Sequence, residues 1–464
     1  MTIESQRGES LAGRVGEFVA RTGFGDIPDE VLVRARHLIL DAVGIAFAST
    51  TFPFADVARD ALTSFESGEH VVLGMKDRLS ARDAALLNGI LIHGLDFDDT
   101  HLPAVAHVTA AVLPAALSTA VASNATTRDL LLAYVLGVEV MARVGMGGAG
   151  GLHDVGFHPT AVAGAFGAAV AAGKVMGLDA TGLAAAQGIA GSQAAGLMEF
   201  LEDGAWTKRF HPGWAAASGL TAASFARAGW TGPPAVYEGR FGLYNTHLAT
   251  RVTRPDAVVE GLGSSWELLR TAVKPFPVCH FNHAFADAAL ILRERHAVRA
   301  EDIAEIRCAI HPVPRKVVCE PVEAKWAPRD EYDAKFSLPF AIAASLVRGR
   351  FTLDELESDA RADSRIRELS RKVVVRDDPE SAFPAAYSGF VEIELLDGQV
   401  FSHREQYNRG HEERPLSDDE IVRKFRGTIG RVADSEEADR VRRAVLELPV
   451  DRPAAEFAEA CGAR

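Results

Sequence analysis

The chain has 464 residues, of which 48% are hydrophobic and 24% charged, a balance typical of a globular protein with more than one domain. The formal net charge of −14 argues against a general nucleic-acid binder and against attachment to an anionic membrane surface. No apolar stretch reaches the ~20 residues of a membrane-spanning helix, and no leader segment is expected. The four cysteines show no CxxC spacing, so we expect neither a zinc ribbon nor a disulfide framework, and the cytoplasm is the expected compartment.

Residues 8 to about 250 have the pattern of successive helices. Ser80 followed by Asp83 predicts a capped helix start, and Thr127 is expected to begin another helix in the same way. Stretches rich in alanine and glycine, such as 161–173, let neighbouring helices approach closely. We therefore expect these stretches at the centre of a helical bundle.

After about residue 270 the pattern changes to short strands between helices. Residues 306–310 alternate apolar and polar side chains, which is the period of a half-buried strand. Residues 391–396 and 399–403 flank an Asp-Gly pair and predict a hairpin. The fold class is therefore expected to be mainly α, with a smaller α+β domain that contains an antiparallel sheet.

The same change of pattern sets the domain boundaries that we predict. Residues 1–268 form the helical domain, residues 269–404 form the α+β domain, and residues 405–464 return to the helical domain.

One short segment concentrates ionisable side chains between apolar helices. Burying a charge is costly unless it is paired, so such a cluster predicts a reaction pocket. The cluster contains Asp96, Asp98, Asp99, Thr100, His93, His101 and His107.

Other segments bring histidines and cations to predicted helix starts, where free backbone N–H groups favour anions. A pocket built from these parts would suit a small polycarboxylate. The side chains are His158 in GFHPT, Lys208, Arg209 and His211 in TKRFHPG, and Lys274, Cys279 and His280 in KPFPVCHFNH.

Four segments together resemble the MmgE/PrpD family: LDFDDTHLP with AHV, GFHPT, TKRFHPG and KPFPVCHFNHAFADA. The resemblance runs from about residue 8 to 440. The family includes 2-methylcitrate dehydratase, cis-aconitate decarboxylase and iminodisuccinate epimerase. The resemblance implies a helical domain, an α+β lid domain, an active site between them and a homodimer. It implies a polycarboxylate substrate and no metal, iron–sulfur cluster or other cofactor.

The resemblance also implies roles for particular residues. Making or breaking a C–H bond beside a carboxylate needs a proton-transfer group at the carbon and positive charge at the carboxylate oxygens. We expect His107 and His158 to transfer protons, and Asp96 to orient a neighbouring histidine or lysine. Lys208 and Lys274 bind and polarise the substrate carboxylates in this scheme. Residues expected to bind substrate or to line the pocket are Thr100, Arg209, Cys279 and His280.

One departure separates this chain from the decarboxylases of that family. In decarboxylase-like members the threonine is followed by Trp-His-Pro and the next histidine comes one residue sooner. Here Thr100 is followed by His-Leu-Pro, and His107 lies one position later. We therefore expect first a cofactor-independent hydro-lyase of the 2-methylcitrate dehydratase type. The alternatives on the same substrate class are an epimerase and a decarboxylase.

Several of these residues also have structural interpretations. Asp98 and Asp99 could cap the next helix, and His93 and His101 are expected to be structural. The aspartates also allow a Mg²⁺-dependent enzyme, and a non-catalytic binding protein that kept the pocket is a further possibility. Residues 145–150 fit GxGxxG but follow a helical pattern, so we expect a loop there and no dinucleotide site.

Overall fold

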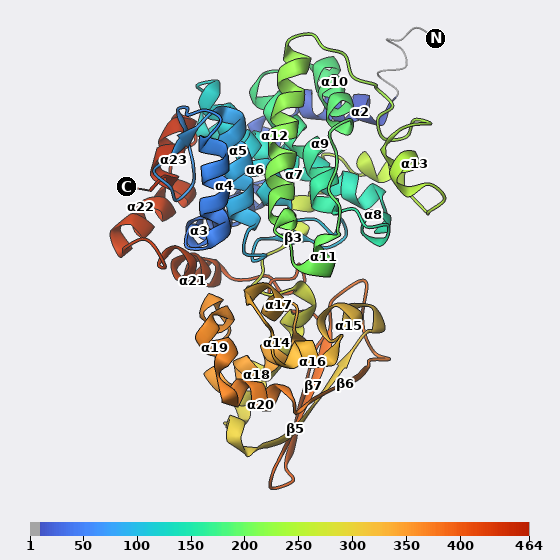
Figure 1. Cartoon of the computed structure of the whole chain (residues 1–464). Coiled ribbons are helices and arrows are strands. Elements are labelled where there is room, and N and C mark those ends of the chain that lie inside the picture. Colours follow the sequence, from blue (N-terminus) through green and yellow to red (C-terminus); the bar gives the residue numbers. More distant parts are fainter. Residues whose placement is uncertain (1–9, 464) are drawn as a thin grey trace. The chain divides into compact units, whose positions relative to one another are not determined.

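The computed structural model describes residues 10–463, and the chain forms two compact units. The first unit combines the described parts of residues 1–273 and 417–464, and the second comprises residues 274–416. Figure 1 shows that the first unit is helical and that the second contains both helices and a sheet. The expected fold class, mainly α with a smaller α+β part, is therefore confirmed.

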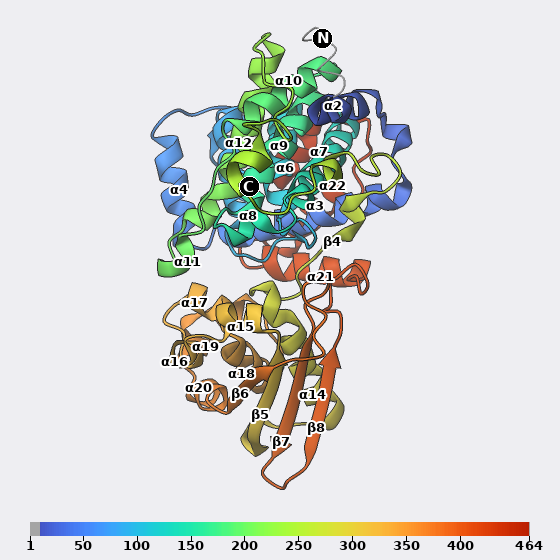
Figure 2. The same ribbon diagram turned by 90° about the vertical axis from the view of Figure 1, so that its right-hand side faces the viewer.

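The first unit is built around helix α9 (Pro159–Val175). All residues of α9 from Pro159 to Gly173 are buried, and most are alanine, glycine or valine. Helices α6 (Val108–Ala122), α7 (Thr127–Gly147) and α12 (Thr207–Arg227) pack directly against it (Figures 1 and 2). Small side chains permit this close approach, so the alanine-rich segment lies at the centre of the bundle as expected.

The remaining helices of this unit surround that centre. The C-terminal segment returns to it, since α21 packs against α3 and α23 packs against α6. The longer helices are α2 (Leu11–Arg21), α3 (Asp29–Ser49), α4 (Pro53–Thr63), α5 (Ala81–His93), α10 (Ala180–Gly191), α21 (Asp418–Ile429), α22 (Ser435–Leu446) and α23 (Ala454–Cys461). The short elements are α8 (Gly151–Asp154), α11 (Phe200–Asp203), α13 (Leu243–Leu248) and the strand pairs β1 (His70–Val71) with β2 (Arg78–Leu79), and β3 (Thr100–His101) with β4 (Thr271–Ala272).

Helix starts follow the capping residues with one shift. The Ser80 side chain accepts a hydrogen bond from the Asp83 N–H at the start of α5, as predicted. The cap of α7 is Thr126, one residue earlier than expected, because its hydroxyl and the Asp129 carboxylate form the reciprocal capping box. The GxGxxG stretch is also only partly a loop, since its first three residues, 145–147, complete α7.

Helix α7 is long and apolar enough to cross a membrane by length and composition, as is the bent pair α3 and α4. However, 94% of the apolar window of α7 is buried within the protein, which is typical of a core helix.

The second unit is a four-stranded sheet with helices packed beside it. The strand order is β6-β5-β7-β8, and Figure 2 shows β7 between β5 and β8. Helix α14 packs against β7, β8 and α18. The strands are β5 (Ile303–Ile310), β6 (Val373–Asp377), β7 (Gly389–Leu395) and β8 (Val400–Glu405). The helices are α14 (His283–His296), α15 (Pro312–Val318), α16 (Val322–Trp326), α17 (Glu331–Lys335), α18 (Leu338–Arg348), α19 (Ser358–Ala362) and α20 (Ser364–Ser370).

This sheet is mixed, whereas an antiparallel sheet was expected. Strands β7 and β8 form the predicted hairpin, with Gly398 in the left-handed region at φ +85°. Strand β6 pairs with β5 in parallel, because the chain between them passes through several helices before it returns to the sheet. Alternation of apolar residues predicts a strand but does not show its direction, so the sequence pattern could not reveal this pair.

Helices α5 and α12 cross at two glycines that allow their backbones to touch. A Cβ atom at Gly89 would lie 2.5 Å from Gly213 Cα, and a Cβ atom at Gly213 would collide with the Leu86 carbonyl oxygen. The crossing therefore requires glycine at both positions. It also fixes the end of α5, where His93 lies, relative to the start of α12, where Lys208 lies.

Replacing Gly213 by alanine is expected to destabilise the protein by about 1–3 kcal/mol, because the methyl group has no space at the crossing. The matched control is Gly427→Ala on α21, where nothing lies within 4 Å and alanine should stabilise the helix by up to about 1 kcal/mol. Chemical denaturation measures both changes. A Gly213→Ala variant as stable as the parent protein would contradict this account of the crossing.

Candidate active site

The candidate site begins with the segment that links α5 to α6. Helix α5 ends at His93, and His107 is the residue that precedes the first turn of α6. Between them Asp96 has a φ of +52°, in the left-handed region that aspartate tolerates better than most residues. A non-glycine residue held there inside a buried segment is typical of functional sites.

Asp96 forms a buried ion pair with Lys208. The Lys208 ammonium donates to Asp96 Oδ2 at 2.9 Å, and the two side chains are only 12% and 6% exposed. Lys208 and Arg209 lie in the first turn of α12. The sequence pattern predicts a position just before the helix. Because an isolated buried charge is costly, this pair allows both charged groups to lie inside the protein.

His107 lies between carboxylates. Its Nδ1–H donates to the Asp99 carbonyl oxygen at 2.8 Å, an orientation that directs the acceptor lone pair to Nε2. The Nε2 atom lies 4.0 Å from Asp96 Oδ1, and Nδ1 lies 3.4 Å from Asp98 Oδ1. The imidazole of His107 therefore has a carboxylate on each side of its ring.

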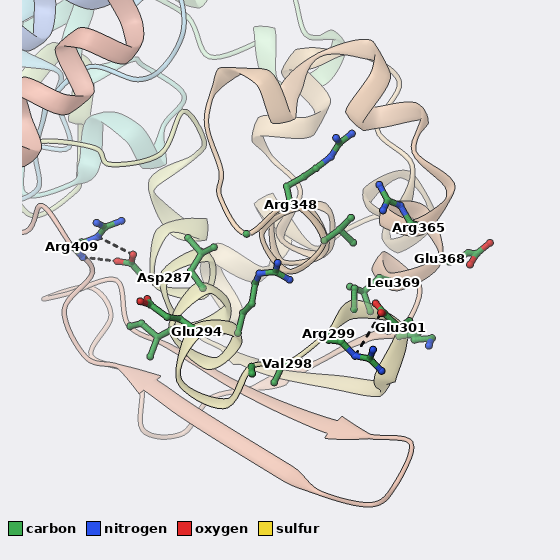
Figure 3. Close-up of a pocket in the computed structure, with 18 of the residues that line it drawn as sticks. Asp287, Glu294, Val298, Arg299, Glu301, Arg348, Arg365, Glu368, Leu369 and Arg409 are labelled. Carbon is green, nitrogen blue, oxygen red and sulfur yellow. Dashed lines mark hydrogen bonds and ion pairs between the residues drawn. The ribbon is translucent and has the colours of Figure 1, made fainter.

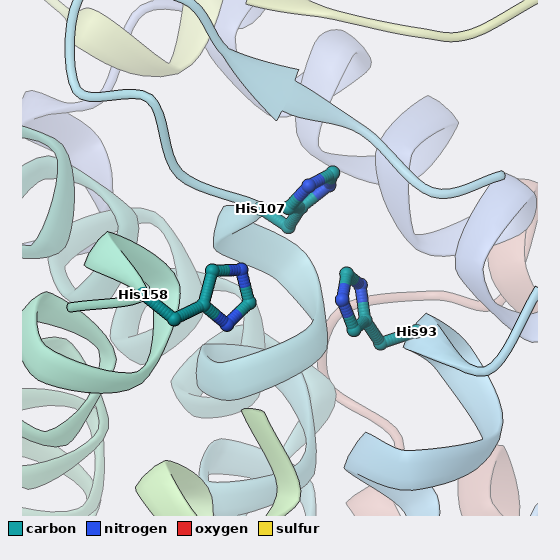
Figure 4. Close-up of side chains that lie close together, drawn as sticks. All are labelled: His93, His107 and His158. Atoms are coloured by element: carbon teal, nitrogen blue, oxygen red, sulfur yellow. The ribbon is translucent and has the colours of Figure 1, made fainter. Parts of the chain in front are cut away.

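His93 belongs to the same cluster, although we expected it to be structural. Its Nδ1 lies 2.8 Å from Asp98 Oδ2, and its ring centre lies 4.6 Å from that of His107 and 5.7 Å from that of His158. Figure 4 shows the three rings grouped together from three different segments. Burial lowers the pKa of His93 to about 4. His93 is therefore neutral near pH 7 and donates its Nδ1–H to Asp98.

Asp98 is the negative centre of this cluster. Burial alone would raise the pKa of Asp98, but the adjacent His93 and His107 hold that pKa well below its usual range. The carboxylate therefore stays ionised and bridges two imidazoles, so Asp98 does not cap the next helix.

Asp99 has the opposite environment. Its carboxylate accepts hydrogen bonds from the hydroxyl and the backbone N–H of Thr109, in the first turn of α6. Burial, with the negative charge of Asp98, raises the pKa of Asp99 to about 7. For Asp99 the capping interpretation is therefore correct. The three aspartates consequently have different partners, and the arrangement expected for a Mg²⁺ site built on all three is not formed.

His158 is held by His211, which the TKRFHPG segment places in the predicted pocket without a specific role. His158 precedes Pro159 at the start of α9, and its Nδ1 lies 3.1 Å from Nδ1 of His211 on α12. Burial, together with the nearby His93 and Lys208, lowers the pKa of His158 well below its ordinary value. Burial likewise lowers the pKa of His211 to about 4. Both rings are therefore neutral near pH 7, and one donates its Nδ1–H to the other.

Two of the residues expected to bind substrate also belong to the first unit. Thr100 is buried on β3, and its hydroxyl finds no hydrogen-bond partner among the described residues. An unsatisfied buried hydroxyl is suited to receive a polar ligand. The guanidinium of Arg209 lies over the ring of Phe54, 4.4 Å from its centre. His101, expected to be structural, bonds Glu267 at 3.0 Å through Nε2.

The other expected site residues belong to the second unit. Lys274 is only 2% exposed. His280 Nε2 lies 2.9 Å from Asn408 Nδ2, and the backbone N–H of Cys279 donates to the Lys335 carbonyl oxygen. The structure thus brings Asp96, His107, His158 and Lys208 together within the first unit. It places Lys274, Cys279 and His280 in the second.

The second unit also contains a cavity of about 1230 Å³ with many arginines in its wall (Figure 3). None of the expected site residues lines it. Several of its arginines are already paired: Arg409 with Asp287, Arg299 with Asp302 and Arg365 with Asp363. These pairs neutralise much of the positive charge, so we do not assign the active site to this cavity.

The low pKa of His93 predicts a pH-dependent stability. The ordinary pKa is 6.5 and the folded value is about 4, so the unfolded chain takes up a proton first as the pH falls. The stability that neutral His93 contributes is complete above pH 6.5 and is lost as the pH falls toward 4, by up to about 1.4 kcal/mol per pH unit. The difference in unfolding free energy between the parent protein and His93→Gln should therefore shrink over this range, as measured by chemical denaturation. A difference in unfolding free energy that stays constant with pH would refute the low pKa of His93.

Comparison with known proteins agrees with the motifs. Residues 13–255 match the MmgE/PrpD N-terminal domain, and residues 276–449 match the MmgE/PrpD C-terminal domain. The chain is 30% identical to the cis-aconitate decarboxylase-like protein oryM of Aspergillus oryzae, over 98% of each chain. It is 32% identical to cis-aconitate decarboxylase of Homo sapiens, over 88% of this chain and 85% of the relative. It is 28% identical to cis-aconitate decarboxylase of Aspergillus terreus, over 97% and 96%. The chain therefore belongs to the MmgE/PrpD family.

Proposed function

We propose that this chain is a cofactor-independent lyase that removes CO₂ from a small unsaturated tricarboxylate of the cis-aconitate type. The observation that carries the proposal is the buried Asp96–Lys208 ion pair beside the imidazoles of His107 and His158. The names of the relatives support decarboxylation over the dehydration that the sequence led us to expect first.

The proposed reaction needs one proton and a group that tolerates negative charge. The leaving carboxylate is attached to a carbon next to a C=C bond. When the C–C bond breaks, its electron pair forms a new double bond, and the electrons of the original double bond take a proton at the far carbon. The products are CO₂ and an unsaturated dicarboxylate. Charge that develops on the remaining carboxylate is stabilised by a nearby cation.

We assign the proton donor to His107 and the cation to Lys208. The His107 ring lies between the carboxylates of Asp96 and Asp98, with Nε2 4.0 Å from Asp96 Oδ1 and Nδ1 3.4 Å from Asp98 Oδ1. The Lys208 ammonium is held by Asp96, and its positive charge is suited to bind a carboxylate. His158 is neutral near pH 7, so it suits the base of the related reactions that begin by removing a proton.

Other residues complete the proposed site. The unsatisfied hydroxyl of Thr100 donates to a substrate carboxylate, and Arg209 assists in binding. We propose that Lys274 binds a second carboxylate and that Cys279 and His280 contact the substrate. In this proposal the second unit, residues 274–416, supplies substrate-binding groups.

Dehydration is the second candidate, because one segment differs from the decarboxylases. The longer spacing between Thr100 and His107 is accommodated by a turn in which Val105 has a φ of +53°. A β-branched residue rarely adopts that conformation, so the backbone here is constrained in an unusual way. This segment carries two proposed site residues, and its different sequence spacing supports a substrate or reaction other than that of the decarboxylases.

Product analysis tests the proposal directly. The purified chain is incubated with cis-aconitate in D₂O, and CO₂ release and the NMR spectrum are followed. Decarboxylation predicts one CO₂ and one deuterium for each unsaturated dicarboxylate formed. Loss or addition of water without CO₂ release, from cis-aconitate or from a panel of 2-hydroxy tricarboxylates, would favour dehydration and reject the decarboxylase.

Substitutions at His107 and Lys208 test the proton donor and the cation separately. His107→Gln should lower kcat by about 10²- to 10⁴-fold, because it removes the proton donor. Lys208→Met should lower kcat/KM by about 10²-fold or more, and Lys208→Arg should retain more activity because it keeps the charge. The exposed Lys76→Met is the matched control and should leave both constants unchanged. Near-normal turnover in His107→Gln, with loss only in His158→Gln, would reject this assignment.

We also propose that the chain works as a homodimer through the outer face of α12. Phe210, Trp214 and Phe225 are 42%, 43% and 46% exposed, and their spacing places them on one face of the helix. Clustered exposed aromatic residues on a globular protein typically mark an interaction surface.

Trp214→Glu is expected to convert the dimer to a monomer, because it places a charge in the proposed interface. Light scattering coupled to gel filtration should give 49.6 kDa for this variant and twice that mass for the parent protein. Phe65→Glu, at a residue that is 79% exposed and outside α12, should remain dimeric. A monomeric parent protein, or a dimer that Trp214→Glu leaves intact, would reject this interface.

Finally, we propose a cytoplasmic location. Cys308, Cys319 and Cys461 are free thiols among the described residues, and this supports a reducing compartment.

A further inference from the structure

We propose that His93, His107 and His158 form a binding site for one divalent transition-metal ion of the zinc class. One ring nitrogen of each residue can be chosen so that the three atoms lie within 4.8 Å of one another. The rings come from the end of α5, the start of α6 and the start of α9, and they gather as Figure 4 shows. Imidazole nitrogen is a preferred ligand of zinc, nickel and copper ions but not of Mg²⁺.

Each of the three rings is already oriented as a metal ligand is. In metal sites the ring nitrogen that does not bind the ion usually bonds a carboxylate, a carbonyl or another acceptor. Here the Nδ1 atom of His93 bonds Asp98 at 2.8 Å, and that of His107 bonds the Asp99 carbonyl at 2.8 Å. The Nδ1 atom of His158 contacts His211 at 3.1 Å. In His93 and His107 this leaves Nε2 to bind a ligand, and in His158 it does so when His158 donates its Nδ1–H to His211.

His93 provides an independent sign that something binds there. Its side chain is fully buried, and its Nε2 atom has no hydrogen-bond partner among the described residues. A buried polar atom without a partner is costly and calls for a ligand or water.

The surrounding charge is compatible with a cation. Ligand atoms of Asp96, Asp98 and His107 also lie within 4.8 Å of one another. The ammonium group of Lys208 is paired with Asp96 at 2.9 Å. Zn–N bonds of about 2.0–2.1 Å place tetrahedral ligands about 3.3 Å apart, so the rings need to move by about an ångström to close on the ion.

Metal binding at this site would inhibit the reaction, a consequence that rests on the proposed function. The ion would occupy the nitrogen lone pairs that proton transfer through His107 and His158 requires. Zinc would then act as a reversible inhibitor that competes with protonation of the site. Binding itself does not depend on which reaction the protein catalyses.

Titration of the full chain with ZnCl₂ tests the site. The protein is first freed of metal with a chelator and dialysed, and binding is followed by isothermal titration calorimetry near pH 7. We expect one Zn²⁺ per chain, with binding weakened about tenfold or more in His93→Gln. The matched control is His101→Gln, because His101 is equally buried in the same segment but both its ring nitrogens are bonded. That variant should bind zinc as the parent protein does.

The outcomes separate this inference from the proposed function. Absence of stoichiometric binding, or equal binding by the parent protein and His93→Gln, would overturn the metal site whatever the activity. If His93→Gln does not fold, His158→Gln replaces it in the same comparison. Zinc that raises turnover would overturn the inhibitory role. Zinc binding that depends on His93, in a chain without lyase activity, would leave the metal site intact and reject only the proposed reaction.

Discussion

The ion pair between Asp96 and Lys208 holds the candidate site together. It joins the segment after α5 to the first turn of α12, at the helix pair whose close crossing depends on Gly89 and Gly213. Burying either charge without its partner would destabilise the fold, so each charge makes the burial of the other possible. The pair also leaves the ammonium beside the imidazole of His107, where a carboxylate can share it.

The acidic segment shows how environment gives adjacent residues different states. Asp98 and Asp99 are neighbours in sequence, yet the two imidazoles beside Asp98 hold its pKa well below the usual range. Burial beside that negative charge raises the pKa of Asp99 to about 7. One carboxylate is therefore the permanent charge of the histidine cluster, and the other fixes the start of α6 through Thr109. A count of carboxylates along the segment would treat them alike.

Local signals in the sequence predicted most of the fold. Alanine-rich helices, the cap at Ser80 and the Asp-Gly hairpin depend on residues close together in the chain, and the structure agrees with them. The parallel pairing of β6 with β5 depends on the path of the intervening chain, which a short pattern does not encode. At the site, the motifs identified Asp96 and Lys208 but not their contact. His93 was expected to be structural and the role of His211 was left open, because a histidine in a helix carries no sign of its tertiary partner.

A crystal structure with a saturated tricarboxylate, which has no double bond to react, would test the central claim most directly. The account predicts one carboxylate within hydrogen-bond distance of Lys208 Nζ and another group near the Thr100 hydroxyl, with the His107 ring beside the ligand. A ligand found instead among the arginines of the cavity in residues 274–416, with the histidine cluster empty, would contradict the account.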